Sequence, residues 1–185
     1  MIIDETLAAP VRSWVLDKSN RDALFVEPGS GTINVSGLPH CEMADAKRMR
    51  RKLPVVEMFK IYQSILANYG LPKTQPLDKE FGALISFSEK GHKVQPHKDP
   101  NPPGKVHVRF NVLISKPEGG GQAIINNQIV DTKENEVWIC AAGNFEHSSV
   151  TVEGDKPRIL LSYGTYLTQN KLNELLDGEN QTEDK

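Results

Sequence analysis

The sequence has little cysteine, no long apolar run and no basic N-terminal segment, and each absence excludes a class of protein. The two cysteines, Cys41 and Cys140, lie far apart and lack the spacing of metal ligands, which is typical of reduced thiols in a cytosolic protein. No apolar run approaches the roughly 20 residues that a membrane span needs. The first ten residues carry an acidic pair and no basic residue, so they do not resemble a signal peptide. We therefore expect a cytoplasmic protein without a membrane partner.

Charge of neither sign is in large excess. The net charge is -2, which predicts no general attraction to nucleic acid or to an anionic membrane. One basic run, KRMRRK at residues 47–52, departs from this balance. We interpret it as the solvated face of a helix, because blocks of like charge are usually exposed. The alternative is a contact for phosphate or for an acidic partner.

The chain has 185 residues, of which 38% are hydrophobic, and this suits one domain with one core. We expect that domain to span residues 1–177. Residues 1–79 would give helical and strand support, and residues 80–167 would form a β core. The acidic, polar residues 178–185 are expected to be a disordered tail.

Helical signals lie at the two ends of the chain. Apolar residues recur at helical spacing over residues 55–69, where Pro54 suits the first turn and Gly70 and Pro72 end the pattern. Residues 172–178 are a candidate last helix. For the first third we also expect two short strands and a short helical segment, at residues 23–26, 33–35 and 43–52.

Short runs rich in Val, Ile and aromatics dominate the rest of the chain, separated by clusters of Gly, Pro, Asn and Asp. Six such runs occur with no helix among them, which predicts an antiparallel sandwich or barrel. The runs are residues 81–87, 105–114, 122–130, 136–141, 148–152 and 157–167.

The most informative motif is a His-x-Asp sequence between two prolines, formed by His97 and Asp99. Residues two apart in an extended chain point to the same side, so both side chains can face one metal ion. A second histidine, His147, follows after several more strands. Two imidazoles and one carboxylate on one face of an octahedral metal form the triad of non-haem iron(II) oxygenases, which leaves three positions open.

An arginine follows at the start of the last strand. Arg158 begins an otherwise apolar run, where a buried cation is costly unless it is paired. Its planar guanidinium suits a carboxylate bound through two parallel hydrogen bonds. A small carboxylate bound beside the metal would supply that partner.

With these residues in this order, the sequence resembles the iron(II)- and 2-oxoglutarate-dependent dioxygenases over residues 80–167. It looks closest to their prolyl-hydroxylase-like branch. In that branch an aromatic strand and a glycine precede the His-x-Asp motif, an arginine opens the next strand, and a Gly-Gly turn follows. The matching residues in this chain are Phe87, Gly91, Arg109 and Gly119–Gly121.

The resemblance implies a mainly β fold with N-terminal helices, a double-stranded β-helix of the jelly-roll, cupin-like type. It implies iron(II) bound by His97, Asp99 and His147. It also implies that Arg158, assisted by Ser162, binds the distal carboxylate of 2-oxoglutarate, with dioxygen as the other co-substrate.

Several residues near the motif have more than one interpretation. Phe87 departs from the family pattern, which often has a tyrosine there that reaches the co-substrate. Arg109 is either a structural arginine or a substrate ligand, and Asn111, on the same strand face, shares that ambiguity. We expect His107 to have a structural or substrate-side role, and Trp138 to belong to the core.

The predicted activity is hydroxylation of a C–H bond in an amino-acid side chain, peptidyl or free, or in a small metabolite, with release of succinate and carbon dioxide. Two alternatives stay open. AlkB-like nucleic-acid demethylases share the motif residues, but they usually carry a second arginine where this chain has Gly164. A cupin-like module that binds a metal without catalysis shares the fold, although such a site has no need of Arg158.

Overall fold

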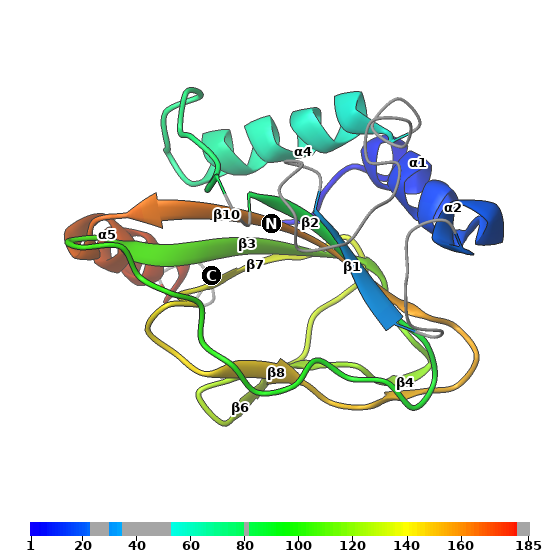
Figure 1. The fold of residues 1–185 in the computed structure, drawn as a ribbon. Coiled ribbons are helices and arrows are strands. Elements are labelled where there is room, and N and C mark those ends of the chain that lie inside the picture. Colours follow the sequence, from blue (N-terminus) through cyan, green and yellow to red (C-terminus); the bar gives the residue numbers. More distant parts are fainter. Residues whose placement is uncertain (23–29, 35–52, 80–81, 181–185) are drawn as a thin grey trace.

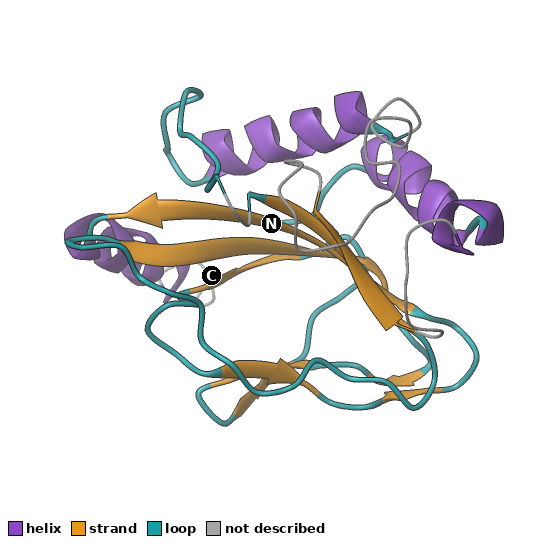
Figure 2. Ribbon diagram, in the orientation of Figure 1, coloured by secondary structure: helices purple, strands orange, loops and turns teal. Residues whose placement is uncertain are grey.

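A computed structural model describes residues 1–22, 30–34, 53–79 and 82–180. Three layers are visible (Figure 1). Helices lie above a large antiparallel sheet, and short strands lie below it (Figure 2). The helices of the upper layer are α1 (Glu5–Leu16), α2 (Lys18–Asp22) and α4 (Val55–Asn68).

The large sheet has five strands in the order β1-β2-β10-β3-β7, all paired antiparallel. Their bounds are Ser30–Asn34, Ala83–Ser88, Arg158–Leu167, Val106–Ser115 and Val137–Cys140, in that order. The chain leaves β10 into the last helix, α5 (Gln169–Asn180).

The lower layer consists of two small antiparallel sheets. One has the order β6-β5-β8, and the other pairs β4 with β9. The bounds of β4, β5, β6, β8 and β9 are Gly119–Gly120, Ala123–Ile125, Gln128–Val130, His147–Ser149 and Val152–Glu153. The two layers of strands confirm the predicted mainly β, double-stranded β-helix architecture with N-terminal helices.

The two faces of the large sheet have different compositions, because side chains alternate along each strand. On β3, Val108, Phe110 and Val112 join the main hydrophobic core beneath α1 and α4. Their neighbours His107 and Arg109 are also buried but point to the side of the short strands. One long buried strand therefore serves both a packed core and a polar interior.

The structure corrects several expected boundaries. The run 122–130 is a hairpin rather than one strand, because Asn126 and Asn127 adopt positive φ and turn the chain between β5 and β6. The run 148–152 is divided between β8 and β9. Helix α5 begins at Gln169 and continues to Asn180, three residues into the expected tail.

The helix predicted at residues 55–69 is confirmed as α4. The expected strand at 33–35 overlaps the end of β1. The strand expected at 23–26, the helical segment at 43–52 and its basic run lie outside the described residues. Within the described ranges, no helix combines the length and apolar character that crossing a membrane requires.

Candidate metal centre

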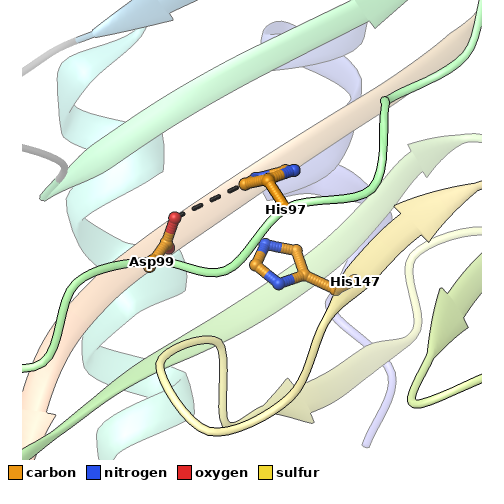
Figure 3. Close-up of side chains that lie close together, drawn as sticks. All are labelled: His97, Asp99 and His147. Carbon is orange, nitrogen blue, oxygen red and sulfur yellow. Dashed lines mark ion pairs between the residues drawn. The ribbon is translucent and has the colours of Figure 1, made fainter.

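The structure brings His97, Asp99 and His147 together, as Figure 3 shows. Their possible ligand atoms all lie within 4.8 Å of one another. Backbone hydrogen bonds hold the two histidine segments side by side: His97 N donates to His147 O at 3.1 Å, and His147 N donates to His97 O at 2.9 Å. Asp99 N donates to Ala142 O at 3.0 Å. The site is thus assembled by pairing across the barrel.

Each histidine has one ring nitrogen that faces a carbonyl oxygen. His97 Nδ1 lies 2.7 Å from Gln95 O, and His147 Nδ1 lies 3.3 Å from Phe145 O. A carbonyl only accepts, so Nδ1 is the donor in both rings and Nε2 is left as the ligand atom. Burial, followed by the neighbouring His97, lowers the pKa of His147. This favours the neutral imidazole that a metal requires.

Two side chains contact the same oxygen of the Asp99 carboxylate. Arg109 Nε donates to Asp99 Oδ2 at 2.7 Å, and His107 Nδ1 lies 2.9 Å from that atom. The other oxygen, Oδ1, is 3.9 Å from His97 Nε2. Burial raises the pKa of Asp99, but the hydrogen bonds from His107 and Arg109 outweigh it and hold the pKa well below its usual range. Asp99 is therefore an ionised ligand candidate at neutral pH.

Beside the triad lies a cavity of about 170 Å³ between the large sheet and the short strands. Arg158 reaches into it from the start of β10 and is 3% exposed. Gly121 leaves room for its stem, since a Cβ there would lie 3.2 Å from Arg158 Cδ. The lining side chains are Leu84, Ser86, Val94, His97, Arg109, Asn111, Ala123, Ile125, Trp138, Cys140, His147, Ser148, Arg158, Leu160 and Ser162.

The guanidinium of Arg158 lacks hydrogen-bond partners for two of its nitrogens. Among the described residues, nothing accepts a hydrogen bond from its buried Nε or Nη1. Burial lowers its pKa to about 10, so the group is still a cation at neutral pH. A buried cation without a partner is costly, so the cavity has the chemical character that suits an anion.

The other predicted site residues also line this cavity. Ser162 Oγ accepts a hydrogen bond from Arg109 Nη1 at 3.2 Å, and Asn111 lies in the lining beside them. Arg109 thus joins Asp99 to Ser162. Trp138 lines the cavity while packing with a small apolar cluster.

Phe87 does not lie where the family pattern suggested. It belongs to the main core on the helix side, because the side chains of β2 alternate between the two faces. The neighbouring Ser86 lines the cavity instead. Ser86 was not predicted as a site residue, because the family pattern draws attention to the aromatic residue at position 87 and does not show which face of the strand lines the cavity.

Comparison with family models and with curated proteins found no match. Solved structures do match, at low identity. AviO1 from Streptomyces viridochromogenes aligns over 91% of this chain and 87% of its own, with TM-score 0.56 and 10% identity. A viral collagen prolyl hydroxylase from Paramecium bursaria Chlorella virus-1, solved as its 2-oxoglutarate complex, aligns over 90% and 92%, with TM-score 0.52 and 12% identity.

A Pseudomonas putida prolyl-4-hydroxylase aligns over 88% of each chain, with TM-score 0.49 and 18% identity. At these identities the likeness concerns the fold and leaves the activity of this chain to its own residues. The chain has the double-stranded β-helix fold found in prolyl-hydroxylase-like 2-oxoglutarate oxygenases.

Proposed function

We propose that residues 1–177 form one oxygenase domain that depends on iron(II) and 2-oxoglutarate. It would hydroxylate a C–H bond of an amino-acid side chain, peptidyl or free, or of a small metabolite, and release succinate and carbon dioxide. The observation that carries the proposal is the buried guanidinium of Arg158, whose Nε and Nη1 have no hydrogen-bond partner among the described residues, in the cavity that His97 and His147 line.

The donor set suits iron(II). His97, Asp99 and His147 offer two imidazole nitrogens and one carboxylate oxygen within 4.8 Å of one another, the combination typical of non-haem iron oxygenases. When bound, the metal and 2-oxoglutarate would supply the oxidising chemistry. The protein would supply an ionised Asp99 and a neutral His147, and a metal held by three protein ligands alone would keep three positions open.

The cavity suits a small dicarboxylate. The planar fork of Arg158 offers two parallel donors to one carboxylate, and Ser86 and Ser162 place hydroxyls on the same lining. Apolar side chains such as Leu160 and Trp138 also line the cavity. Low dielectric strengthens the charge pairing that Arg158 would gain on binding.

The prime substrate would approach from the solvent side of the metal. The side chain of His97 is 46% exposed, and Phe145, close to His147 in sequence, is exposed as well. A side chain presented by a peptide, or a free small molecule, can reach such an open rim. A metal module without catalysis has no use for an unpaired cation at this depth, which favours the oxygenase over the cupin-like alternative.

The test is oxygen consumption by purified protein with iron(II) and 2-oxoglutarate, across a panel of peptides and amino acids. Binding of 2-oxoglutarate is measured in parallel without oxygen, with manganese(II) in place of iron. Asp99→Ala should abolish metal binding and turnover, and Arg158→Lys should sharply weaken 2-oxoglutarate binding, since a point charge loses the two-point geometry.

Lys156→Met is the matched control, because Lys156 is a partly exposed cation two residues from Arg158 and pairs with Glu134. It should behave as wild type in both assays. If the wild-type protein binds 2-oxoglutarate no better with manganese(II) than without it, and Arg158→Lys binds equally well, the proposal fails.

A further inference from the structure

Behind the candidate metal ligand lies a buried chain of polar side chains. His107 is completely buried and sits between two carboxylates. Its Nδ1 lies 2.9 Å from Asp99 Oδ2, and its Nε2 lies 3.3 Å from Asp78 Oδ2. The two ring nitrogens point in different directions, so the imidazole links the carboxylates across the interior.

Asp78 is itself fixed in place, and it is 3% exposed. Tyr166 donates its hydroxyl to Asp78 Oδ1 at 3.0 Å, and Asp78 N donates to Gly164 O at 2.8 Å. The ring of Tyr166 also packs against His107, with centroids 5.2 Å apart. Asp78 and Tyr166 therefore hold the imidazole in one orientation.

This arrangement determines which oxygen of Asp99 can meet a metal. Oδ2 accepts a hydrogen bond from Arg109 Nε and lies 2.9 Å from His107 Nδ1, while Oδ1 is the oxygen near His97 Nε2. A carboxylate can bind a metal through one oxygen or through both. These two contacts at Oδ2 favour binding through Oδ1 alone, which would leave three positions open on a bound metal.

Burial of two carboxylates costs free energy, so a row of polar residues such as Asp78, His107 and Asp99 is unusual if its only role is to stabilise the fold. The apolar core on the other face of β3 already packs the strand. Outer partners that orient carboxylate and imidazole ligands are a general feature of metal sites, and their loss typically weakens metal binding about 10- to 100-fold. The position of His107, directly against Asp99, fits this role.

We propose that Asp78 and His107 are positioning residues that hold Asp99 as a one-oxygen metal ligand. The inference rests on the proposed metal centre and deepens it. Neither residue is among those that line the cavity. Both act through Asp99.

The experiment measures manganese(II) and cobalt(II) binding by the full chain, without co-substrate or oxygen. The variants are Asp78→Asn, His107→Leu and the double variant, and circular dichroism checks that each is folded. We expect each single variant to bind manganese(II) about 10- to 100-fold more weakly. The cobalt(II) absorption spectrum should change shape, because Asp99 would bind through both oxygens or turn away.

The double variant shows whether Asp78 acts on metal affinity through His107 or independently of it. If Asp78 acts through His107, adding Asp78→Asn to His107→Leu should weaken binding no further. Should His107→Leu fail to fold, His107→Gln replaces it, since an amide donates to Asp99 but cannot bridge to Asp78. It should recover part of the affinity.

Ser115→Ala is the matched control. Ser115 is buried on the same strand and donates to Pro157 O at 2.9 Å, so this variant loses a buried hydrogen bond without touching the chain of residues. It should bind both metals as wild type does. If Asp78→Asn and His107→Leu keep wild-type affinity and cobalt(II) spectrum while Asp99→Ala binds no metal, the positioning role is wrong and the metal centre stands. If wild type and Asp99→Ala bind metal equally, the proposed function itself fails.

Discussion

The two faces of the large sheet differ in composition and in their role. Toward the helices, β3 and β10 present Phe110, Val112, Ile159 and Leu161 to the main core. Toward the short strands, alternate residues of the same strands are polar or charged and line the cavity; they are Arg109, Asn111, Arg158 and Ser162. The helix face stabilises the fold, and the inner face carries groups whose burial costs free energy.

This contrast indicates where stability and function are separated in the molecule. Burial of apolar surface contributes about 25 cal/mol per Å², so the helix face supplies much of the driving force for folding. The inner face leaves the Arg158 cation without partners among the described residues. A sheet stabilised on one side can tolerate such a group on the other.

The largest effect on stability is expected from the helix face. Phe110 is completely buried, and its ring lies 5.3 Å from that of Tyr69. Phe110→Ala should lower the free energy of unfolding by about 3–5 kcal/mol, because a cavity remains. Urea denaturation measures this loss. Binding of 2-oxoglutarate by the folded fraction should be unchanged, and a large change in that binding would show that the two faces are coupled.

On the inner face, burial should suppress the reactivity of a thiol. Cys140 lines the cavity, and burial, together with the charge of Asp99, raises its pKa to about 12. A rise of about three units lowers the thiolate fraction roughly 1,000-fold. In a Cys41→Ser background, alkylation at pH 8.5 should be slow in native protein and fast after unfolding. Equal rates would mean that this face is open to solvent.

Replacement of Arg158 should raise the free energy of unfolding, whereas replacement of Phe110 should lower it. Its folded-state pKa is about 10, below its ordinary value, through burial, so the cation destabilises the fold at any pH below 10. Arg158→Met should therefore stabilise the protein without ligand by up to about 3 kcal/mol at neutral pH. The gain should shrink as pH rises above 10, because the arginine then loses its proton in the folded state.

Addition of ligand should reduce or remove the stability advantage of Arg158→Met over wild type. At about 100 times its Kd, 2-oxoglutarate with manganese(II) should stabilise wild type by about 2.7 kcal/mol and Arg158→Met not at all. Thermal unfolding with and without the ligand measures both quantities. A loss of stability in the variant without ligand would identify Arg158 as a structural residue.

The sequence predicted those parts of the fold and site that depend on local pattern. Helix α4 follows from apolar spacing, and the adjacency of His97 and Asp99 follows from two residues of extended chain. The proximity of His147 to His97 and Asp99 depends on strand pairing between distant segments. It was predicted from the order in which the motif residues occur in the family that the sequence resembles. The family pattern suggested that Phe87 faces the co-substrate, but Phe87 packs in the main core. Every residue of β2 is apolar or small, so the residue pattern did not show which face of the strand lines the cavity.

The rest depends on tertiary contacts that leave no local signal. Asp78 lies in a polar loop segment and is recognisable as buried only when Tyr166 and His107 pack around it. N-terminal helices were expected, but no boundaries were predicted for α1, which contains Pro10. The hairpin and short strands of the lower layer span two or three residues each, too few for periodicity to place their ends.

The smallest expected effect concerns a hydroxyl on the inner face. Ser162 Oγ accepts from Arg109 Nη1 at 3.2 Å, so Ser162→Ala removes one acceptor while the Arg109 bond to Asp99 remains. The loss should be about 1 kcal/mol in stability and, if the hydroxyl also contacts 2-oxoglutarate, about fivefold in its affinity. Ser115→Ala, which also loses one buried hydrogen bond, should match the stability change and leave the affinity unaltered. Calorimetric titration of both variants separates the two roles: equal affinities would restrict Ser162 to holding Arg109, whereas a loss confined to Ser162→Ala places its hydroxyl on the co-substrate.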